Sequence, residues 1–323
     1  MSAVYFGSFG GEFYAAVLHA DGQIGDLTPI PYAGASCLLR TSPVRLIAAR
    51  ESEHTRGRLA VFDVGEPLCP RLLREIDPAH HGACHLAADG AWLYGASYFS
   101  GCIDAYALED GVPGAAFGAY AFGATGPGDA QGVPRAHGVL PLADGGVLAA
   151  DYSGDRVVYL RRDGSEWQEV SYLPLPAGGG VRHLAAGSGG LIYVITERSA
   201  VVYVVRWDGF TLRLLSEAAV PGGRFCSALK VAPGGEFLYA GSRGGGGFIA
   251  VFRLADGGTH LVPAAALDGL GGVREFAFTP DGRYLLTGDQ NAGMVRVFAP
   301  NEVRIFTREV SRVAVPGVSA IVF

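Results

Sequence analysis

The chain has 323 residues, a formal net charge of −6 and an isoelectric point near 5.7. Its basic residues form no stripe, so the electrostatic footprint of a protein that binds nucleic acid or an acidic membrane surface is missing. Charged residues make up 17% of the chain, hydrophobic residues 49%, and glycine occurs 49 times, a composition that favours short strands joined by turns over a helical protein.

The N-terminus and the cysteines bear on the compartment. The opening MSAVYFGSFGGEFYAAVLHA lacks the pattern of a signal peptide, and no stretch reaches about 18 uninterrupted apolar residues, so we expect a cytoplasmic protein without membrane contact. The five cysteines lack CxxC and Cys/His spacing, which disfavours a disulfide framework and a zinc site. We expect most of them to be small buried residues. They are Cys37, Cys69, Cys84, Cys102 and Cys226.

Strand-like segments repeat along the whole chain. The first is AAVLHA, and it is followed by LAVFDV, IDAYAL, RVVYLR, VYVVRW, IAVFRL and VRVFAP. Equivalent positions in these segments are separated by 45, 44, 53, 46, 47 and 46 residues. The chain therefore contains seven copies of a unit, anchored at Val17, Phe62, Tyr106, Tyr159, Val205, Phe252 and Phe298.

Each unit has the same internal order. In the last complete one, the apolar run FAFT precedes the turn PDGR, and the strand YLLTG, a polar loop and the anchor strand follow. A fourth run comes after the anchor, as HLVPAA does in the preceding unit. Four short strands repeated at this period are typical of a propeller blade. The recurrent GH and WD pairs of WD40 repeats are absent from the sequence.

The two ends of the chain predict how the ring closes. The N-terminal VYFGS and FYAAVLHA already occupy the second and third strand positions, whereas the C-terminal VSAIVF is a first strand without partners. We therefore predict an all-β protein, a seven-bladed β-propeller with four-stranded blades, in which the C-terminal strand joins the N-terminal blade. Residues 1–323 then form a single domain.

Ionisable residues gather at two positions of the repeat. In a propeller, the openings of the innermost strands and the loops after the second strands meet at one mouth of the central channel, where function is expected. The openings contribute His85, His137, Arg182, His183, Arg224 and Arg274. The loops contribute Glu51, Tyr98, Asp151, Glu197, Arg243 and Gln290.

Structural roles remain open for the same residues. Histidines at strand starts are often hydrogen-bonded structural residues, and Asp151 and Asp155 could simply hold their turn. Arg224 stands beside a Gly-Gly turn and could be solvated, and Glu197 could belong to an ion-pair network that lines the channel. The GGGG at 244–247 is not a phosphate loop, because no Lys-Ser/Thr and no helix follow it. GxSxG and HExxH motifs do not occur.

Several motifs resemble a known family. They are VYFGSFG, AHGVLPLADGG with AADYSGDRV, GGGVRH, VITE, AGSR, VREF and TGDQ, in this order and at blade spacing. Together they are similar to those of the seven-bladed propeller lactonases, which include one type of 6-phosphogluconolactonase and the carboxymuconate-lactonising enzymes. The chain departs from the family pattern at Val181, Thr196, Ala228, Ser242 and Asp289.

The resemblance implies an active site and a reaction. It implies catalytic roles for His137, Arg182, Glu197 and Arg243, with His183, Arg274 and Gln290 beside them, and the mouth positions add His85 and Tyr98 as substrate-binding residues. Lactone hydrolysis needs an activated water, a stabilised oxyanion and a protonated leaving group. We expect Glu197 or His137 to accept the water proton and the other to serve the leaving oxygen, while Arg182 and Arg243 stabilise the oxyanion.

The predicted function is therefore that of a lactonase acting on a small anionic lactone, similar to 6-phosphogluconolactone, in carbohydrate metabolism. We expect no metal and no cofactor, and a monomer or weak homo-oligomer. Two alternatives remain: a carboxymuconate-type lactonising cycloisomerase, which would use the same groups to move a proton on carbon, and a non-enzymatic propeller that binds a protein partner.

Overall fold

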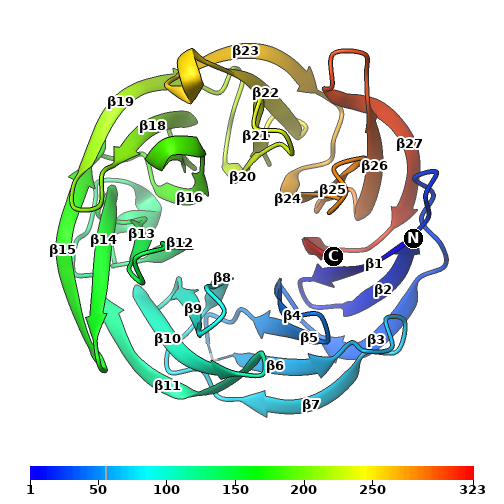
Figure 1. Ribbon diagram of the computed structural model, residues 1–323, viewed down its shortest axis with the longest axis horizontal. Helices are drawn as coiled ribbons and strands as arrows, with labels where there is room; N and C mark the ends of the chain where they lie inside the picture. Colours follow the sequence, from blue (N-terminus) through cyan, green and yellow to red (C-terminus); the bar gives the residue numbers. More distant parts are fainter. Residues whose placement is uncertain (55–56) are drawn as a thin grey trace.

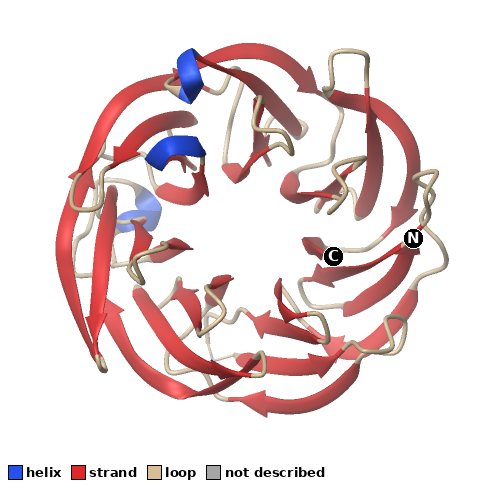
Figure 2. Cartoon of the chain, in the orientation of Figure 1, coloured by secondary structure: helices blue, strands red, loops and turns tan. Residues whose placement is uncertain are grey.

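Seven antiparallel sheets form a closed ring (Figure 1). The computed structural model describes residues 1–54 and 57–323, and within them each sheet has four strands. Figure 2 shows that strands dominate; short 3₁₀ turns lie at η1 (Asp129–Gln131), η2 (Ser188–Gly190) and η3 (Asp256–Gly258). The predicted fold class is confirmed, and the predicted anchor segments are the third strands of the seven blades.

The blades are numbered along the chain, and their strands are given from the channel outward. Blade 1 contains β28 (Val318–Val322), β1 (Ser2–Ser8), β2 (Glu12–Leu18) and β3 (Thr28–Ala33). Blade 2 contains β4 (Cys37–Ser42), β5 (Arg45–Arg50), β6 (Arg58–Asp63) and β7 (Arg71–Ile76). Blade 3 contains β8 (Ala83–Ala88), β9 (Trp92–Ser97), β10 (Cys102–Glu109) and β11 (Val112–Ala121). Blade 4 contains β12 (Ala136–Pro141), β13 (Val147–Asp151), β14 (Arg156–Asp163) and β15 (Glu166–Pro174).

The remaining blades have the same order. Blade 5 contains β16 (Val181–Ala186), β17 (Leu191–Thr196), β18 (Val201–Trp207) and β19 (Leu212–Ala219). Blade 6 contains β20 (Cys226–Val231), β21 (Phe237–Ser242), β22 (Phe248–Ala255) and β23 (His260–Leu267). Blade 7 contains β24 (Val273–Phe278), β25 (Leu285–Asp289), β26 (Met294–Pro300) and β27 (Phe306–Ala314).

The ring closes within blade 1. The last strand, β28, pairs antiparallel with β1, and Tyr5 lies opposite Val322 and Phe6 opposite Ile321. The two chain ends therefore lie close together in Figure 1. Because the inner strand comes from one end of the chain and its partners from the other, the seam is hydrogen-bonded like any other pair of strands and leaves no open edge. The predicted closure is confirmed.

Burial changes from the inner to the outer strands of a blade. All six residues of β17 (LIYVIT) are buried, because both faces of this strand pack against neighbouring blades. The outer strand β15 instead alternates between exposed and half-buried residues, as expected for a strand with one face in solvent. The apolar runs of the sequence therefore mark the middle of the ring wall.

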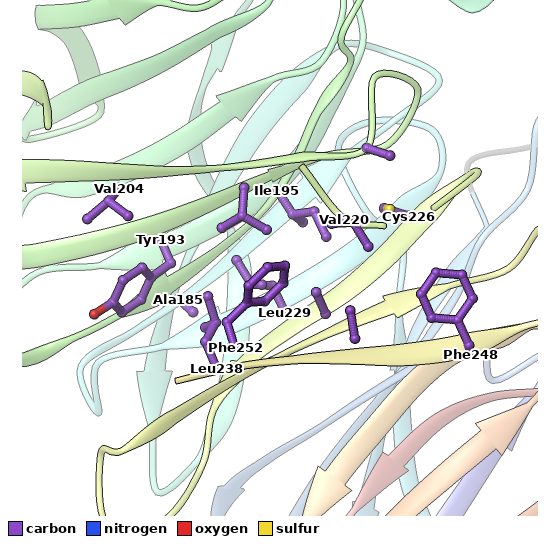
Figure 3. Close-up of a cluster of buried hydrophobic side chains, with 14 of the residues drawn as sticks. Ala185, Tyr193, Ile195, Val204, Val220, Cys226, Leu229, Leu238, Phe248 and Phe252 are labelled. Atoms are coloured by element: carbon purple, nitrogen blue, oxygen red, sulfur yellow. The ribbon is translucent and has the colours of Figure 1, made fainter. Parts of the chain in front are cut away.

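The hydrophobic core consists of clusters between adjacent blades. Figure 3 shows the cluster between blades 5 and 6, where Tyr193 and Ile195 of one blade face Leu229, Leu238 and Phe252 of the other. Equivalent clusters lie at the other interfaces around the ring. Each sheet thus buries both faces against its neighbours, and the ring is held by side-chain packing rather than by hydrogen bonds between blades.

The cysteines only partly follow the expectation that most are buried. Cys102 and Cys226 are buried, but Cys37 and Cys84 are half-buried and Cys69 is exposed. The expectation that most cysteines are buried was therefore wrong. Cys37 and Cys84 keep some exposure because they lie on inner strands that line a cavity of the central channel. In the described part of the chain, no helix is long and apolar enough to cross a membrane.

The interface packing predicts the cost of removing a core ring. Phe252 is fully buried, so Phe252→Ala should lower the free energy of unfolding by about 3–5 kcal/mol through lost contacts and a residual cavity. Phe210 has a 73% exposed side chain, and Phe210→Ala should stay within about 0.5 kcal/mol of the parent protein. Chemical denaturation measures both, and equal effects would contradict the described packing.

Candidate active site

A small cavity lies at the mouth where the inner strands begin. It has a volume of about 140 Å³, far below the roughly 300–1,000 Å³ of sites for drug-sized ligands. Its lining residues come from blades 2 to 7 and occupy the two positions singled out in the sequence. They are Glu51, Tyr98, His137, Arg182, Glu197, Arg243 and Arg274.

A recurring β-bulge helps to aim side chains at this channel. The register of the inner strand against its neighbour shifts at its opening in blades 1, 3, 4, 5, 6 and 7. At these shifts Arg182 of blade 5 and Arg274 of blade 7 have no paired residue on the neighbouring strand. His137 lies within the corresponding shift of blade 4. A bulge leaves a residue outside the ladder and redirects its side chain, which explains why such residues reach the cavity.

Glu197 is the centre of the charged cluster. Its Oε2 lies 2.9 Å from Nη2 of Arg243 and 3.2 Å from Nε of Arg182. The backbone of Glu197 is held on both sides, because its N–H donates to Gly180 and its carbonyl accepts from the N–H of Cys226. The carboxylate therefore sits at a fixed place between blades 5 and 6, with two guanidinium groups on one oxygen.

Arg182 carries unused hydrogen-bonding capacity. The residue is only 2% exposed, and its Nη1 has no hydrogen-bond partner among the described residues. Its Nε makes the ion pair with Glu197 without hydrogen-bond geometry. A buried guanidinium is stable when its donors are paired, so this arrangement leaves donors for an oxygen atom of a ligand.

A second ion pair stands across the mouth. Nη2 of Arg274 lies 3.4 Å from Oε2 of Glu51, and its guanidinium carbon lies 4.4 Å from the centre of the Phe9 ring. Burial raises the pKa of Glu51, although the nearby arginines oppose it, and burial with Arg182 lowers the pKa of Arg274. Burial and Arg182 also lower the pKa of Arg243 to about 10. Positive charge thus exceeds negative charge at this mouth.

Three histidines line one side of the channel. The rings of His137 and His183 are 5.3 Å apart between centres, and those of His183 and His85 are 5.0 Å apart. Burial, with repulsion from nearby cations, lowers the pKa of His137 and His183 well below the usual value, and burial lowers that of His85 to about 4. All three rings are therefore neutral near pH 7, and Nδ1 of His137 is buried without a hydrogen-bond partner among residues 1–54 and 57–323.

Tyrosines close the cavity beside His137. The ring of Tyr98 lies 5.8 Å from His137 and 5.6 Å from Tyr152, centre to centre, and Arg135 covers it at 4.5 Å. Burial raises the pKa of Tyr98, so its hydroxyl remains a neutral donor. The cavity is thus lined by the aromatic rings of Tyr98 and His137 as well as by Glu197 and the arginines.

Asp155 positions the segment that leads to Arg182. Its two carboxylate oxygens accept the backbone N–H groups of Gly180 at 2.6 Å and Gly178 at 2.7 Å, and Nε2 of Gln131 donates to it at 2.9 Å. Gln131 belongs to η1, which lies between the anchor residues Tyr106 and Tyr159, the two successive anchors that are farthest apart in the sequence. Asp151 instead pairs with Arg156 at 2.8 Å. Both aspartates therefore hold local structure, as one interpretation of the sequence proposed.

Two predicted residues lie apart from the cavity. Arg224 precedes β20 and is exposed, so it does not open an inner strand, because β20 begins only at Cys226. Gln290 is half-buried, its backbone N–H donates to Gly272, and it is not among the residues that line either channel cavity. His85 and His183 lie deeper in the channel than the mouth residues.

The positions that depart from the family pattern do not line the mouth cavity. Val181 and Ala228 are fully buried in inter-blade clusters. Thr196, Ser242 and Asp289 are fully buried at the ends of second strands, where Thr196 bonds Val201 and Asp289 pairs with Arg296. These positions therefore lie in the buried structure beneath the mouth loops, and none of them forms part of the cavity surface.

Two contributors were missed in the sequence. Glu51 was named at a loop position but left out of the predicted site, because nothing in the sequence shows that it pairs with Arg274 across the ring. Phe9 follows β1, the second strand of blade 1, so the rule used for the other blades would have found it. Within the described residues, no group of three His, Cys, Asp or Glu side chains is arranged to hold a metal ion.

The ring of seven blades and the charged mouth define a β-propeller with a candidate active site at one end of its central channel. The sequence model of the family "Lactonase, 7-bladed beta-propeller" matches residues 10–323. The chain therefore belongs to this lactonase family. An uncharacterized protein of Lactococcus lactis subsp. cremoris (strain MG1363) is 24% identical over 227 residues, which span 67% of this chain and 66% of that protein.

Solved structures share the whole fold. A Bacteroides fragilis NCTC 9343 protein, provisionally named a 6-phosphogluconolactonase, superimposes with a TM-score of 0.91 at 20% identity and covers 99% of this chain and 97% of its own. The periplasmic gluconolactonase of Pseudomonas aeruginosa gives a TM-score of 0.89 at 22% identity, over 99% of this chain and 98% of its own. At such identities the likeness shows the fold alone.

The low histidine pKa values predict an NMR result. Because protonation is disfavoured in the folded channel, the imidazole shifts of His85, His137 and His183 should show no transition between about pH 8 and pH 5, whereas ordinary histidines titrate near 6.5. Single His→Asn variants assign the signals. A transition near pH 6.5 in any of the three rings would contradict the described burial.

The same pKa shifts predict how stability depends on pH. The unfolded chain binds these protons and the folded chain does not, so the free energy of unfolding should fall as the pH drops below about 6.5.

Proposed function

We propose that this mouth hydrolyses a small anionic lactone. The observation that carries the proposal is the Glu197 carboxylate held by Arg182 and Arg243 beside a neutral His137, whose Nδ1 has no hydrogen-bond partner in the described part of the chain. These groups match the three requirements of ester hydrolysis: an acceptor for the water proton, cations for the oxyanion and a hydrogen-bonding group for the leaving oxygen.

We assign the proton acceptor to Glu197 rather than to His137. Burial and Arg182 lower the pKa of His137 well below its usual value, so this ring is a weak base, whereas Glu197 supplies a carboxylate at the mouth. The water oxygen attacks the lactone carbonyl carbon while Glu197 takes the water proton. Arg182 and Arg243 stabilise the oxyanion that forms.

Ring opening completes the reaction. The bond between the carbonyl carbon and the ring oxygen breaks, and the proton held by Glu197 moves to that oxygen, which becomes a hydroxyl. His137 hydrogen-bonds this oxygen and keeps it in place. The new carboxylic acid ionises when it leaves, so each turnover releases one proton to solvent.

The substrate class follows from charge and size. Three guanidinium groups face two carboxylates at the mouth, so an anionic group on the substrate is attracted there. The cavity admits only a small molecule. A phosphorylated sugar lactone, like the substrate in the name given to the Bacteroides fragilis relative, has this charge and ring chemistry.

The proposed base predicts a rate effect. Glu197→Gln keeps the shape but removes the proton acceptor, so turnover of 6-phosphogluconolactone should fall by about 10²–10⁴-fold in a protein that still folds but is less stable, because two ion pairs are lost. Acid release in weakly buffered solution measures the rate. Glu217→Gln, on the exposed face of β19, is the control and should match the parent protein. Full activity of Glu197→Gln would remove Glu197 from the mechanism.

The proposed anion preference predicts a different effect for Arg243. Arg243→Gln should raise KM for 6-phosphogluconolactone more than for the uncharged gluconolactone, because only the former has a phosphate to pair. Arg213→Gln, exposed on β19, should change neither value. An equal rise in KM for both lactones would show that Arg243 does not bind the phosphate of the substrate.

The reaction type is tested separately. Conversion of carboxymuconolactone by the parent protein without lactone hydrolysis would favour the cycloisomerase instead.

A further inference from the structure

A second cavity lies in the channel below the mouth. Its volume is about 190 Å³, and it shares Arg182 and Arg274 with the mouth cavity. At its far end it borders a surface hollow on the opposite face, because Lys230 and Ile321 line both. The two arginines thus form a partition, with the proposed lactone site on one side and this channel cavity on the other.

The channel cavity has an excess of positive charge. Arg182, Arg274 and Lys230 line it, and the single carboxylate among its lining residues is that of Glu275. Glu275 is already engaged, since its Oε1 lies 3.0 Å from Nζ of Lys230 and accepts the backbone N–H of Phe276. The carboxylates that pair with Arg274 and Arg182 belong to Glu51 and Glu197, which line the mouth and not this cavity.

Two protonated thiols and a buried guanidinium also lie on the cavity wall. Burial raises the pKa of the Cys37 thiol to about 12 and that of Cys84 well above its usual value, so both thiols keep their protons. The hydroxyl of Ser319 uses its proton on the carbonyl of Ser36. The buried Arg182 retains an Nη1 without a partner among the described residues. A wall of this kind is complementary to an acceptor-rich anion.

We propose that the channel cavity binds a small oxyanion of the size of phosphate or sulfate, which enters from the face opposite the mouth. The volume holds one such ion with a few waters. Arginine and lysine together suit a tetrahedral oxyanion, the guanidinium through paired donors and the ammonium as a mobile point charge. Lys230, with 37% of its side chain exposed, stands at the entrance.

The sequence offers a selective probe for this site. Lys230 is the only lysine among the 323 residues. Reductive methylation with ¹³C-formaldehyde keeps its positive charge and places one label in the channel, and the other labelled amine is the N-terminus. Lys230→Gln removes the channel signal and so assigns it. Titration with inorganic phosphate should shift the Lys230 signal saturably and leave the N-terminal signal in place.

Calorimetric titration of the unlabelled protein with inorganic phosphate provides the quantitative test. Lys230→Gln should weaken phosphate binding about tenfold or more, the loss of one charge-assisted hydrogen bond, and Lys230→Arg should retain it. Glu275→Gln should strengthen binding, because it removes the negative charge of a carboxylate on the cavity wall. A general loss of stability cannot weaken phosphate binding in Lys230→Gln and strengthen it in Glu275→Gln. The melting temperature of each variant checks that it is folded.

The result also separates this site from the lactone site. Arg243 lines the mouth cavity and not the channel cavity, so Arg243→Gln should leave the phosphate-dependent shift of the Lys230 signal unchanged. Loss of binding in Arg243→Gln together with unchanged binding in Lys230→Gln would place the phosphate at the mouth and overturn the proposal. Absence of any saturable phosphate binding to the parent protein would overturn it as well.

A consequence for turnover rests on the proposed function. An anion below Arg182 and Arg274 weakens the field that they present to an anionic lactone above, and the coupling between the two ligands is reciprocal. Phosphate binding is measured without lactone, so its failure would leave the proposed hydrolysis untouched. Failure of hydrolysis would equally leave the channel site standing.

Discussion

The antiparallel pairing of β28 with β1 is the constraint on which the other features depend. It joins the two ends of the chain within one blade and closes the ring, in which the repeated strand order makes every inner strand begin at the same mouth. Side chains that are equivalent in the repeat therefore converge on one axis. Without this pairing, Glu51 of blade 2 and Arg274 of blade 7 would not meet across blade 1.

The converging cations determine the chemistry of the channel. Arg182 is buried and shared by two cavities, and its charge acts on the groups around it. It opposes protonation of His137 and lowers the pKa of Arg243. A buried channel lined by these cations is suited to anions. The proposed lactone site and the proposed oxyanion site both depend on the positive charge of Arg182 and Arg274, and they lie on opposite sides of these two arginines.

Precision at the mouth comes from supporting residues outside the cavity. Asp155 and Gln131 hold the glycines that precede Arg182, and backbone hydrogen bonds to Gly180 and from Cys226 hold Glu197. The unusually long interval between Tyr106 and Tyr159 in the sequence contains η1, which supplies Gln131. The longest interval of the repeat thus supports the site. Thr196 and Ser242, where this chain departs from the family pattern, are likewise buried residues outside the cavity.

The sequence by itself determined the repeat, the number of blades and the closing strand, because strand periodicity and turn residues are local and recur seven times. It also brought His137, Arg182, Glu197 and Arg243 to one mouth, since equivalent positions in a ring share an end. It could not show that Arg224 is exposed, that Glu51 joins the site or that Lys230 faces the channel. The tertiary structure decided these, because they depend on bulges, on strand starts shifted by one or two residues and on contacts between blades far apart in the chain.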